Sequence, residues 1–137
     1  MNNMNYKELL MNLLNKSKAS LEEAEAFLIK DKEIEVSIYK GEIDKYSIAE
    51  SGGLSLRGVS DGKMGYSYTE KVDESSVDML IEEALENSKY INDKDPEIIF
   101  EGSKTYENID NYNVNLEKVS ITEKIKFLKD LEERALE

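Results

Sequence analysis

The sequence has 137 residues, of which 39% are hydrophobic and 35% charged, so it is long enough for one globular domain with an ordinary core. Its net charge of −12 and its mere two arginines disfavour direct binding to nucleic acid or an anionic membrane, since phosphates are recognised by clustered cations. The absence of Cys and His excludes disulfides, thiolate nucleophiles and histidine-based catalysis within these residues.

No segment of the sequence reaches membrane-spanning length. The apolar run Leu9–Leu14 is too short for a secretory signal and lacks a basic flank. We therefore expect a cytoplasmic protein without membrane contacts. The acidity is interpreted as a solubility feature, and the competing interpretation is an acidic face that meets a basic partner.

An apolar stripe at helical spacing predicts a first helix over about residues 5–17. The stripe consists of Tyr6, Leu9, Leu10, Leu13 and Leu14. The next segment allows two interpretations. Ser20-Leu21-Glu22-Glu23 has the form of a capping box at the start of a helix, whereas Phe27-Leu28-Ile29 suits a buried strand.

The stretch from Glu33 to Thr69 predicts short strands joined by glycine turns. The first strand alternates Ile34, Val36 and Ile38 with polar residues, as a half-buried strand requires. Lys40-Gly41 predicts a tight turn into a second strand over residues 42–49. In that strand Ile43 and Ile48 are out of phase, which a bulge or an edge position would explain.

Ser51-Gly52-Gly53 predicts a break before another strand, and Asp61-Gly62 is the strongest hairpin signal of the sequence. Before this hairpin, Leu54 and Leu56 are predicted on one face and Ser55, Arg57 and Val59 on the other. After it, Met64, Tyr66 and Tyr68 are predicted on one face and Gly65, Ser67 and Thr69 on the other.

The second half of the sequence predicts two more helices. Asp73 can cap the first of them, whose stripe comprises Val77, Leu80, Ile81, Ala84, Leu85 and Ser88. Residues 92–115 read as a polar connection, in which Ile98-Ile99-Phe100 is a candidate short strand. Ser120-Ile121-Thr122-Glu123 is a capping box before a last amphipathic helix, and the sequence ends inside that helix, which suggests truncation.

These elements predict an α+β fold, with a mostly antiparallel sheet of short strands and amphipathic helices packed on one face. The covered face is expected to hold Ile34, Val36, Leu54, Leu56, Met64 and Tyr66. The opposite, polar face is expected to hold Ser37, Ser55, Arg57, Ser67 and Thr69. Arg57 has two interpretations, a salt bridge with a nearby acid or an anchor for a neighbouring domain or a peptide carbonyl.

The sequence contains no residue that we assign as catalytic or as a metal ligand. Neighbouring carboxylates such as Glu82 with Glu83 and Glu132 with Glu133 lie on solvated helix faces, whereas paired-carboxylate chemistry needs two groups that face each other across a pocket. Ser51-Gly52-Gly53 lacks the spacing and the Lys-Ser/Thr of a phosphate-binding loop.

The order of several short phrases resembles the amino-terminal domain of the TldD/PmbA family, whose members are described as modulators of DNA gyrase and as zinc metallopeptidases. The phrases are Gly41-Glu42-Ile43-Asp44, Gly53-Leu54-Ser55-Leu56-Arg57, Asp61-Gly62-Lys63-Met64-Gly65-Tyr66-Ser67-Tyr68-Thr69 and Glu83-Ala84-Leu85-Glu86-Asn87-Ser88-Lys89, followed by Ser120-Ile121-Thr122-Glu123-Lys124-Ile125. The resemblance favours a strand from about Ala24. Gly58 departs from it, because family members more often carry Val there.

The resemblance implies a longer protein, with an amino-terminal domain over residues 1–92 and a connecting loop and truncated central region over 93–137. Active members hold zinc with a His-Glu-x-x-x-His helix and a later Cys in a carboxy-terminal region, so this chain would hold no cofactor. The PmbA-like branch lacks these ligands and serves as the partner subunit, and the phrase Gly65–Glu70 leans toward that branch.

The function predicted from this resemblance is a non-catalytic portion of a metallopeptidase that helps to form the substrate channel and subunit contacts. Its predicted partners are a sister subunit or downstream domains and a peptide substrate. Arg57, Ser55, Ser67 and Thr69 are the candidate contact residues. The alternative is a stand-alone acidic protein-binding module, an inhibitor or adaptor.

Overall fold

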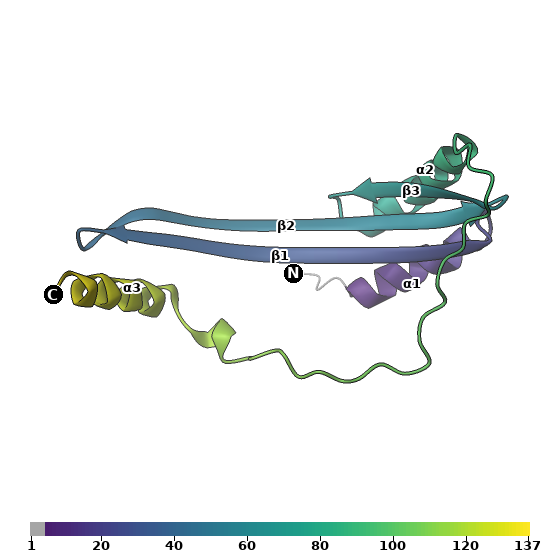
Figure 1. Cartoon of the computed structure of the whole chain (residues 1–137). Helices are drawn as coiled ribbons and strands as arrows, with labels where there is room; N and C mark the ends of the chain where they lie inside the picture. Colours follow the sequence, from purple (N-terminus) through teal and green to yellow (C-terminus); the bar gives the residue numbers. More distant parts are fainter. Residues whose placement is uncertain (1–4) are drawn as a thin grey trace. The chain divides into compact units, whose positions relative to one another are not determined.

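The computed structural model describes residues 5–137, which form three α-helices, two short 3-10 helices and one three-stranded sheet (Figure 1). The described residues divide into two compact units. Within the described residues, unit 1 comprises residues 5–31 and 51–102, and unit 2 comprises residues 32–50 and 103–137. The predicted α+β class is confirmed.

The first helix, α1, spans Tyr6–Ser17, as the apolar stripe predicts. Asn5 caps it, because its side-chain oxygen accepts a hydrogen bond from the backbone N–H of Glu8 at 3.4 Å. Leu9 and Leu13 of this helix are buried, and they carry α1 into the core of unit 1.

The sheet has the strand order β1-β2-β3, with bounds Glu23–Tyr39, Glu42–Ser60 and Lys63–Thr69. β1 confirms the strand that the resemblance favours over a helix. The first two strands, of 17 and 19 residues, are longer than expected, since neither Asp31-Lys32 nor Ser51-Gly52-Gly53 interrupts them. A helix would lose the two-residue alternation that turns Ala24, Ala26 and Leu28 toward the core.

Both strand connections are two-residue turns in which each residue has a positive φ. The values are 53° and 77° at Lys40 and Gly41, and 50° and 70° at Asp61 and Gly62. Such turns match the twist of antiparallel strands, and glycine adopts their geometry without steric cost. The two turns predicted from the sequence are thus confirmed.

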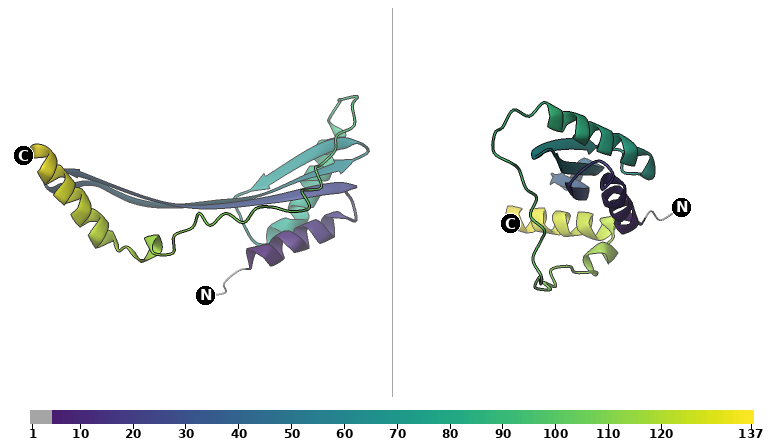
Figure 2. Two further views of the ribbon diagram at one scale, coloured as in Figure 1. Left: turned by 60° about the horizontal axis from the view of Figure 1, so that its bottom comes forward. Right: turned by 90° about the vertical axis from the view of Figure 1, so that its right-hand side faces the viewer.

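The core of unit 1 lies between the sheet and the helices α1 and α2, which are neighbours in Figure 2. α2 spans Val77–Lys89 and follows the 3-10 helix η1, Glu74–Ser76, with Asp73 as the cap of η1. The buried hydrophobic cluster consists of Leu9, Leu13, Leu21, Leu54, Leu56, Val77, Leu80, Ile81 and Ala84.

Unit 2 contains the far end of the β1–β2 hairpin and the last helix, α3, which spans Ile121–Leu136. The predicted capping box is present, since the Ser120 hydroxyl accepts from the Glu123 N–H and the Glu123 carboxylate accepts from the Ser120 N–H. The 3-10 helix η2, Leu116–Lys118, precedes α3.

The segment between α2 and η2 has no regular secondary structure, so the short strand considered at Ile98-Ile99-Phe100 is wrong. This segment instead makes single contacts with the sheet. The Glu97 N–H donates to the Gly62 carbonyl at 2.9 Å, and the Ile99 N–H donates to the Glu23 carboxylate at 2.5 Å. None of the helices within residues 5–137 combines the length and the hydropathy of a membrane span.

Candidate functional site

The register between β2 and β3 assigns side chains to the two faces of the sheet. Leu56 pairs with Ser67, Leu54 with Thr69 and Arg57 with Tyr66 in this antiparallel ladder. Directly opposed residues point to the same face. Ser67 and Thr69 therefore share the face of the buried leucines. The residues of β3 alternate as predicted, but their assignment to the covered and the opposite face is wrong.

The physical reason for this phase is the close approach of α2 to β3. A Cβ added at Gly65 would overlap the carbonyl oxygen of Ala84, which belongs to the helix backbone. Only a residue without a side chain fits there, and the small Ser67 follows on the same face. Large residues such as Tyr66 consequently point to the opposite side of the sheet, which we call the outer face.

Ser67 is a core residue rather than a surface contact. Its side chain is buried, and its hydroxyl donates a hydrogen bond to the Leu80 carbonyl of α2 at 2.7 Å. The Asn87 amide also donates to the Tyr66 carbonyl at 2.8 Å. Ser67 thus helps to hold α2 on the sheet.

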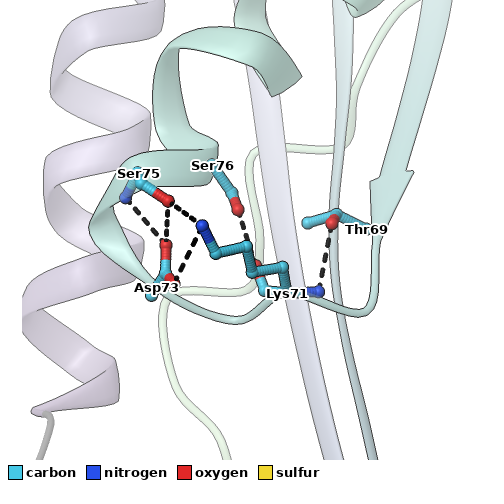
Figure 3. A network of polar contacts seen from close by, with 5 residues as sticks. All are labelled: Thr69, Lys71, Asp73, Ser75 and Ser76. Atoms are coloured by element: carbon cyan, nitrogen blue, oxygen red, sulfur yellow. Dashed lines mark hydrogen bonds and ion pairs between the residues drawn. The ribbon is translucent and has the colours of Figure 1, made fainter.

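Thr69 takes part in the polar network that turns the chain from β3 into α2 (Figure 3). Its hydroxyl accepts from the Lys71 N–H at 3.1 Å, and the Ser76 hydroxyl donates to the Lys71 carbonyl at 2.7 Å. The Asp73 carboxylate accepts from the Ser75 N–H at 2.8 Å and from its hydroxyl. These bonds to Ser75 lower the pKa of Asp73.

Arg57 and Ser55 lie on the outer face, where Arg57 forms the salt bridge that one of its two interpretations predicts. Its Nη2 donates to the Glu25 carboxylate at 3.0 Å, and its Nε lies 2.8 Å from the other carboxylate oxygen. This hydrogen bond and the charge of Glu25 raise the pKa of Arg57. The pair joins β2 to β1 and leaves little net charge at this point of the surface.

Exposed apolar and aromatic side chains surround the Arg57–Glu25 pair. Phe27 and Ile29 lie on the same face of β1 as Glu25, two and four residues further along the strand. Tyr66 and Tyr68 pair with Arg57 and Ser55 across the β2–β3 ladder. The exposed fractions are 59% for Phe27, 46% for Ile29, 56% for Tyr66 and 49% for Tyr68. The outer face, defined by these four residues with Ser55, Arg57 and Glu25, is therefore apolar rather than polar as predicted.

Sequence reasoning missed the apolar residues of this face because it assigned large side chains to the core. The signal that identifies them is the small size of several residues on the core-facing side of the same strands, namely Ala24 and Ala26 on β1 and Gly65 on β3. Ser37, the remaining member of the predicted polar face, lies in unit 2. Its hydroxyl donates to the Asp44 carboxylate at 3.2 Å.

The described residues do not fit a zinc site of the kind that the family resemblance implies. Residues 5–137 contain no group of three or more His, Cys, Asp or Glu side chains that could hold a metal ion. The sequence also lacks every His and Cys. Zinc ligation in a further part of a longer protein stays a prediction.

Comparison with known families agrees with this fold. Residues 24–88 match the sequence profile of the PmbA/TldA metallopeptidase domain 1, a segment that includes the whole sheet except one residue of β1. The matched segment is therefore an amino-terminal domain of the TldD/PmbA type. No curated protein matches the chain significantly.

Solved structures support the same assignment. A candidate modulator of a DNA gyrase from Thermotoga maritima has a TM-score of 0.73 at 27% identity, and TldE from Thermococcus kodakarensis has 0.72 at 21%. A candidate modulator of DNA gyrase from Bacteroides thetaiotaomicron has 0.65 at 17%. These matches cover 90%, 85% and 93% of this chain, but only 28%, 27% and 30% of those proteins.

Proposed function

We propose that this chain is a non-catalytic first-domain portion of a cytoplasmic PmbA/TldD-type metallopeptidase. In the complete protein it helps to wall the channel for a peptide substrate and to form contacts with downstream domains or a sister subunit. The peptide-cleaving residues, and zinc if the protein holds it, would lie in another part of that protein.

The outer face carries this proposal. Four large side chains, each about half exposed, present on the order of several hundred Å² of apolar and aromatic surface, a size at which patches on soluble proteins mark interaction sites. Tyrosine and phenylalanine are also enriched in protein interfaces. The rest of the same assembly is the occupant that fits, because the solved relatives are more than three times as long as the portion matched here.

The experiment compares assembly of the longer protein with and without this face. The double variant Phe27→Ser/Tyr66→Ser removes two aromatic side chains that are exposed in unit 1, so its first domain should fold normally. We expect a shift from the assembled to the dissociated species in sedimentation velocity, together with loss of peptidase activity. Unchanged assembly and activity would overturn the proposed role of the outer face.

Tyr90→Ser is the matched control, since Tyr90 is 78% exposed and follows the end of α2, outside the strands that form the outer face. Its assembly should equal that of the wild type. A second arm incubates the 137-residue chain alone with peptide and added zinc. No hydrolysis is expected, and metal-dependent cleavage by this chain would refute a non-catalytic role.

A stand-alone acidic binding module is the second candidate, and the net charge of −12 is the observation that favours it. The sequence of the source gene downstream of residue 137 distinguishes the two candidate functions. Continuation into a His-Glu-x-x-x-His segment or its degenerate counterpart excludes a stand-alone module. The same charge argues against direct contact with duplex DNA, so retention on immobilised DNA at physiological salt is not expected.

A further inference from the structure

The turn between β1 and β2 binds a carboxylate of the same chain. The Lys40 N–H donates to Glu132 Oε1 at 2.8 Å, and the Gly41 N–H donates to Glu132 Oε2 at 2.6 Å. In a two-residue hairpin turn these N–H groups lie outside the strand ladder and need another partner. Each oxygen of the carboxylate therefore satisfies one backbone donor, and both hydrogen bonds are charge-assisted.

The remaining contact between α3 and the hairpin in unit 2 is apolar and incompletely closed. An open groove of about 460 Å³ separates the two elements, with Ile34 and Val36 of β1 on one side and Phe127 and Leu128 of α3 on the other. Phe127 is still 67% exposed. Such partial burial gives only part of the stabilisation of a buried side chain, so the polar contact contributes a large share of α3 docking.

Glu132 provides the polar contact between α3 and the β1–β2 hairpin. The capping box occupies the first turn of α3 and uses Ser120 and Glu123 within the helix itself. Within residues 5–137, Glu132 is the α3 side chain with hydrogen bonds to the hairpin backbone. The side chain of its neighbour Glu133 forms no hydrogen bond or ion pair in the described part of the chain, and offers a matched position for comparison.

We propose that Glu132 is a latch that holds α3 on the β1–β2 hairpin, and that its release exposes the apolar residues of the groove. The hairpin belongs to the matched first-domain segment 24–88, whereas α3 lies beyond it. The latch thus couples this domain to the segment that follows it in the chain. It is a conformational device that goes beyond the proposed function and needs neither peptidase activity nor assembly to operate.

The test is amide hydrogen exchange by NMR on the purified protein with Glu132→Gln. The variant keeps the size of the side chain but turns one acceptor into an N–H₂ donor opposite a backbone donor. Loss of a hydrogen bond to a charged group corresponds to an increase in exchange of about tenfold or more. We expect this increase at Lys40 and Gly41, and also at the α3 amides.

Glu133→Gln makes the same change in charge one residue later and should leave all these rates unchanged. The amide of Leu80 in unit 1 reports global stability and should stay constant in both variants. Faster exchange at Lys40 and Gly41 with unchanged exchange at the α3 amides would show that the Glu132 contact does not hold α3 on the hairpin, and would overturn the proposal. Equal rates in Glu132→Gln and the wild type, or equal effects of both variants, would overturn it as well.

Discussion

Ser67 on β3 donates its hydroxyl proton to the carbonyl oxygen of Leu80 on α2, at 2.7 Å, inside the layer between sheet and helix. The bond lies two residues along β3 from Gly65, where the helix backbone approaches the sheet most tightly among the glycine positions of β3 and β2. A small residue with a hydroxyl meets both requirements of this position, because it fills little space and satisfies its own buried polar group.

Ser67→Ala should lower the free energy of unfolding by about 0.5–1.5 kcal/mol, the usual net value of one hydrogen bond. Urea denaturation followed by circular dichroism measures this change. Ser47→Ala, at an exposed position of β2, is the control and should shift the midpoint little. A Ser67→Ala protein as stable as the control would show that the bond to Leu80 contributes nothing.

Gly65→Ala should destabilise unit 1 more than Gly58→Ala. The new Cβ at position 65 meets the backbone of Ala84, which cannot move without shifting α2, whereas that at position 58 meets only the Leu21 side chain. We expect a loss of about 3 kcal/mol or more in the first variant and about 1–2 kcal/mol in the second, in the range of overpacked cores. Thermal and urea unfolding of both variants would reveal the order, and the reverse order would contradict the α2 packing.

Arg57→Glu should weaken assembly of the longer protein while costing the fold little. The side chains of Arg57 and Glu25 are 43% and 44% exposed, and such pairs contribute roughly 1 kcal/mol or less to stability. The variant places two carboxylates together on the outer face. The charge-swapped double variant Glu25→Arg/Arg57→Glu restores the ion pair and should recover assembly in sedimentation velocity. If assembly does not recover, it depends on the Arg57 side chain itself and not on the ion pair.

Stability should fall in acid partly through Asp73. Its pKa is lowered in the folded protein by the hydrogen bonds from Ser75, so the unfolded chain takes up the proton first as the pH falls. The contribution is present above the ordinary pKa of about 3.9, declines below it and is lost once the pH falls through the lowered value. Asp73→Asn should flatten this part of the dependence, measured as urea midpoints between about pH 5 and 2.

The control for Asp73 is Asp78→Asn, which removes another acidic side chain of the same region, one that pairs with Lys16 at 3.0 Å and is 74% exposed. Because exposed pairs contribute little to stability, this variant should change the acid dependence less than Asp73→Asn does. Equal flattening in the two variants would argue against a special role of the Ser75 hydrogen bonds.

The elements of this fold follow from local patterns, whereas the faces of β3 do not. The capped helices and the glycine turns at Lys40-Gly41 and Asp61-Gly62 depend on residues close together in the sequence, so they could be predicted. The phase of β3 depends on its pairing with β2 and on the distance to α2, which no local pattern contains. Tyr66 consequently passed for a core residue, and Ser67 for an exposed one.

The candidate site was predicted in part for the same reason. Arg57 and Ser55 have the predicted face, because their alternation with Leu54 and Leu56 on one strand is decisive. Phe27 and Ile29 escaped notice, since a run of apolar residues does not distinguish a buried strand from an exposed interface. The contrast in size with Ala24 and Ala26 carries that information.

The path of the chain through the two compact units affects where the protein can be divided. β1 enters unit 2 after residue 31, β2 returns after residue 50, and the segment after Gly102 enters it again. A truncation before α3 would leave the hairpin end without its helix and the turn amides without Glu132. Long strands with bare apolar faces associate with one another. An expression fragment that follows the matched segment 24–88 alone would lack both α1 and α3, and we expect it to aggregate.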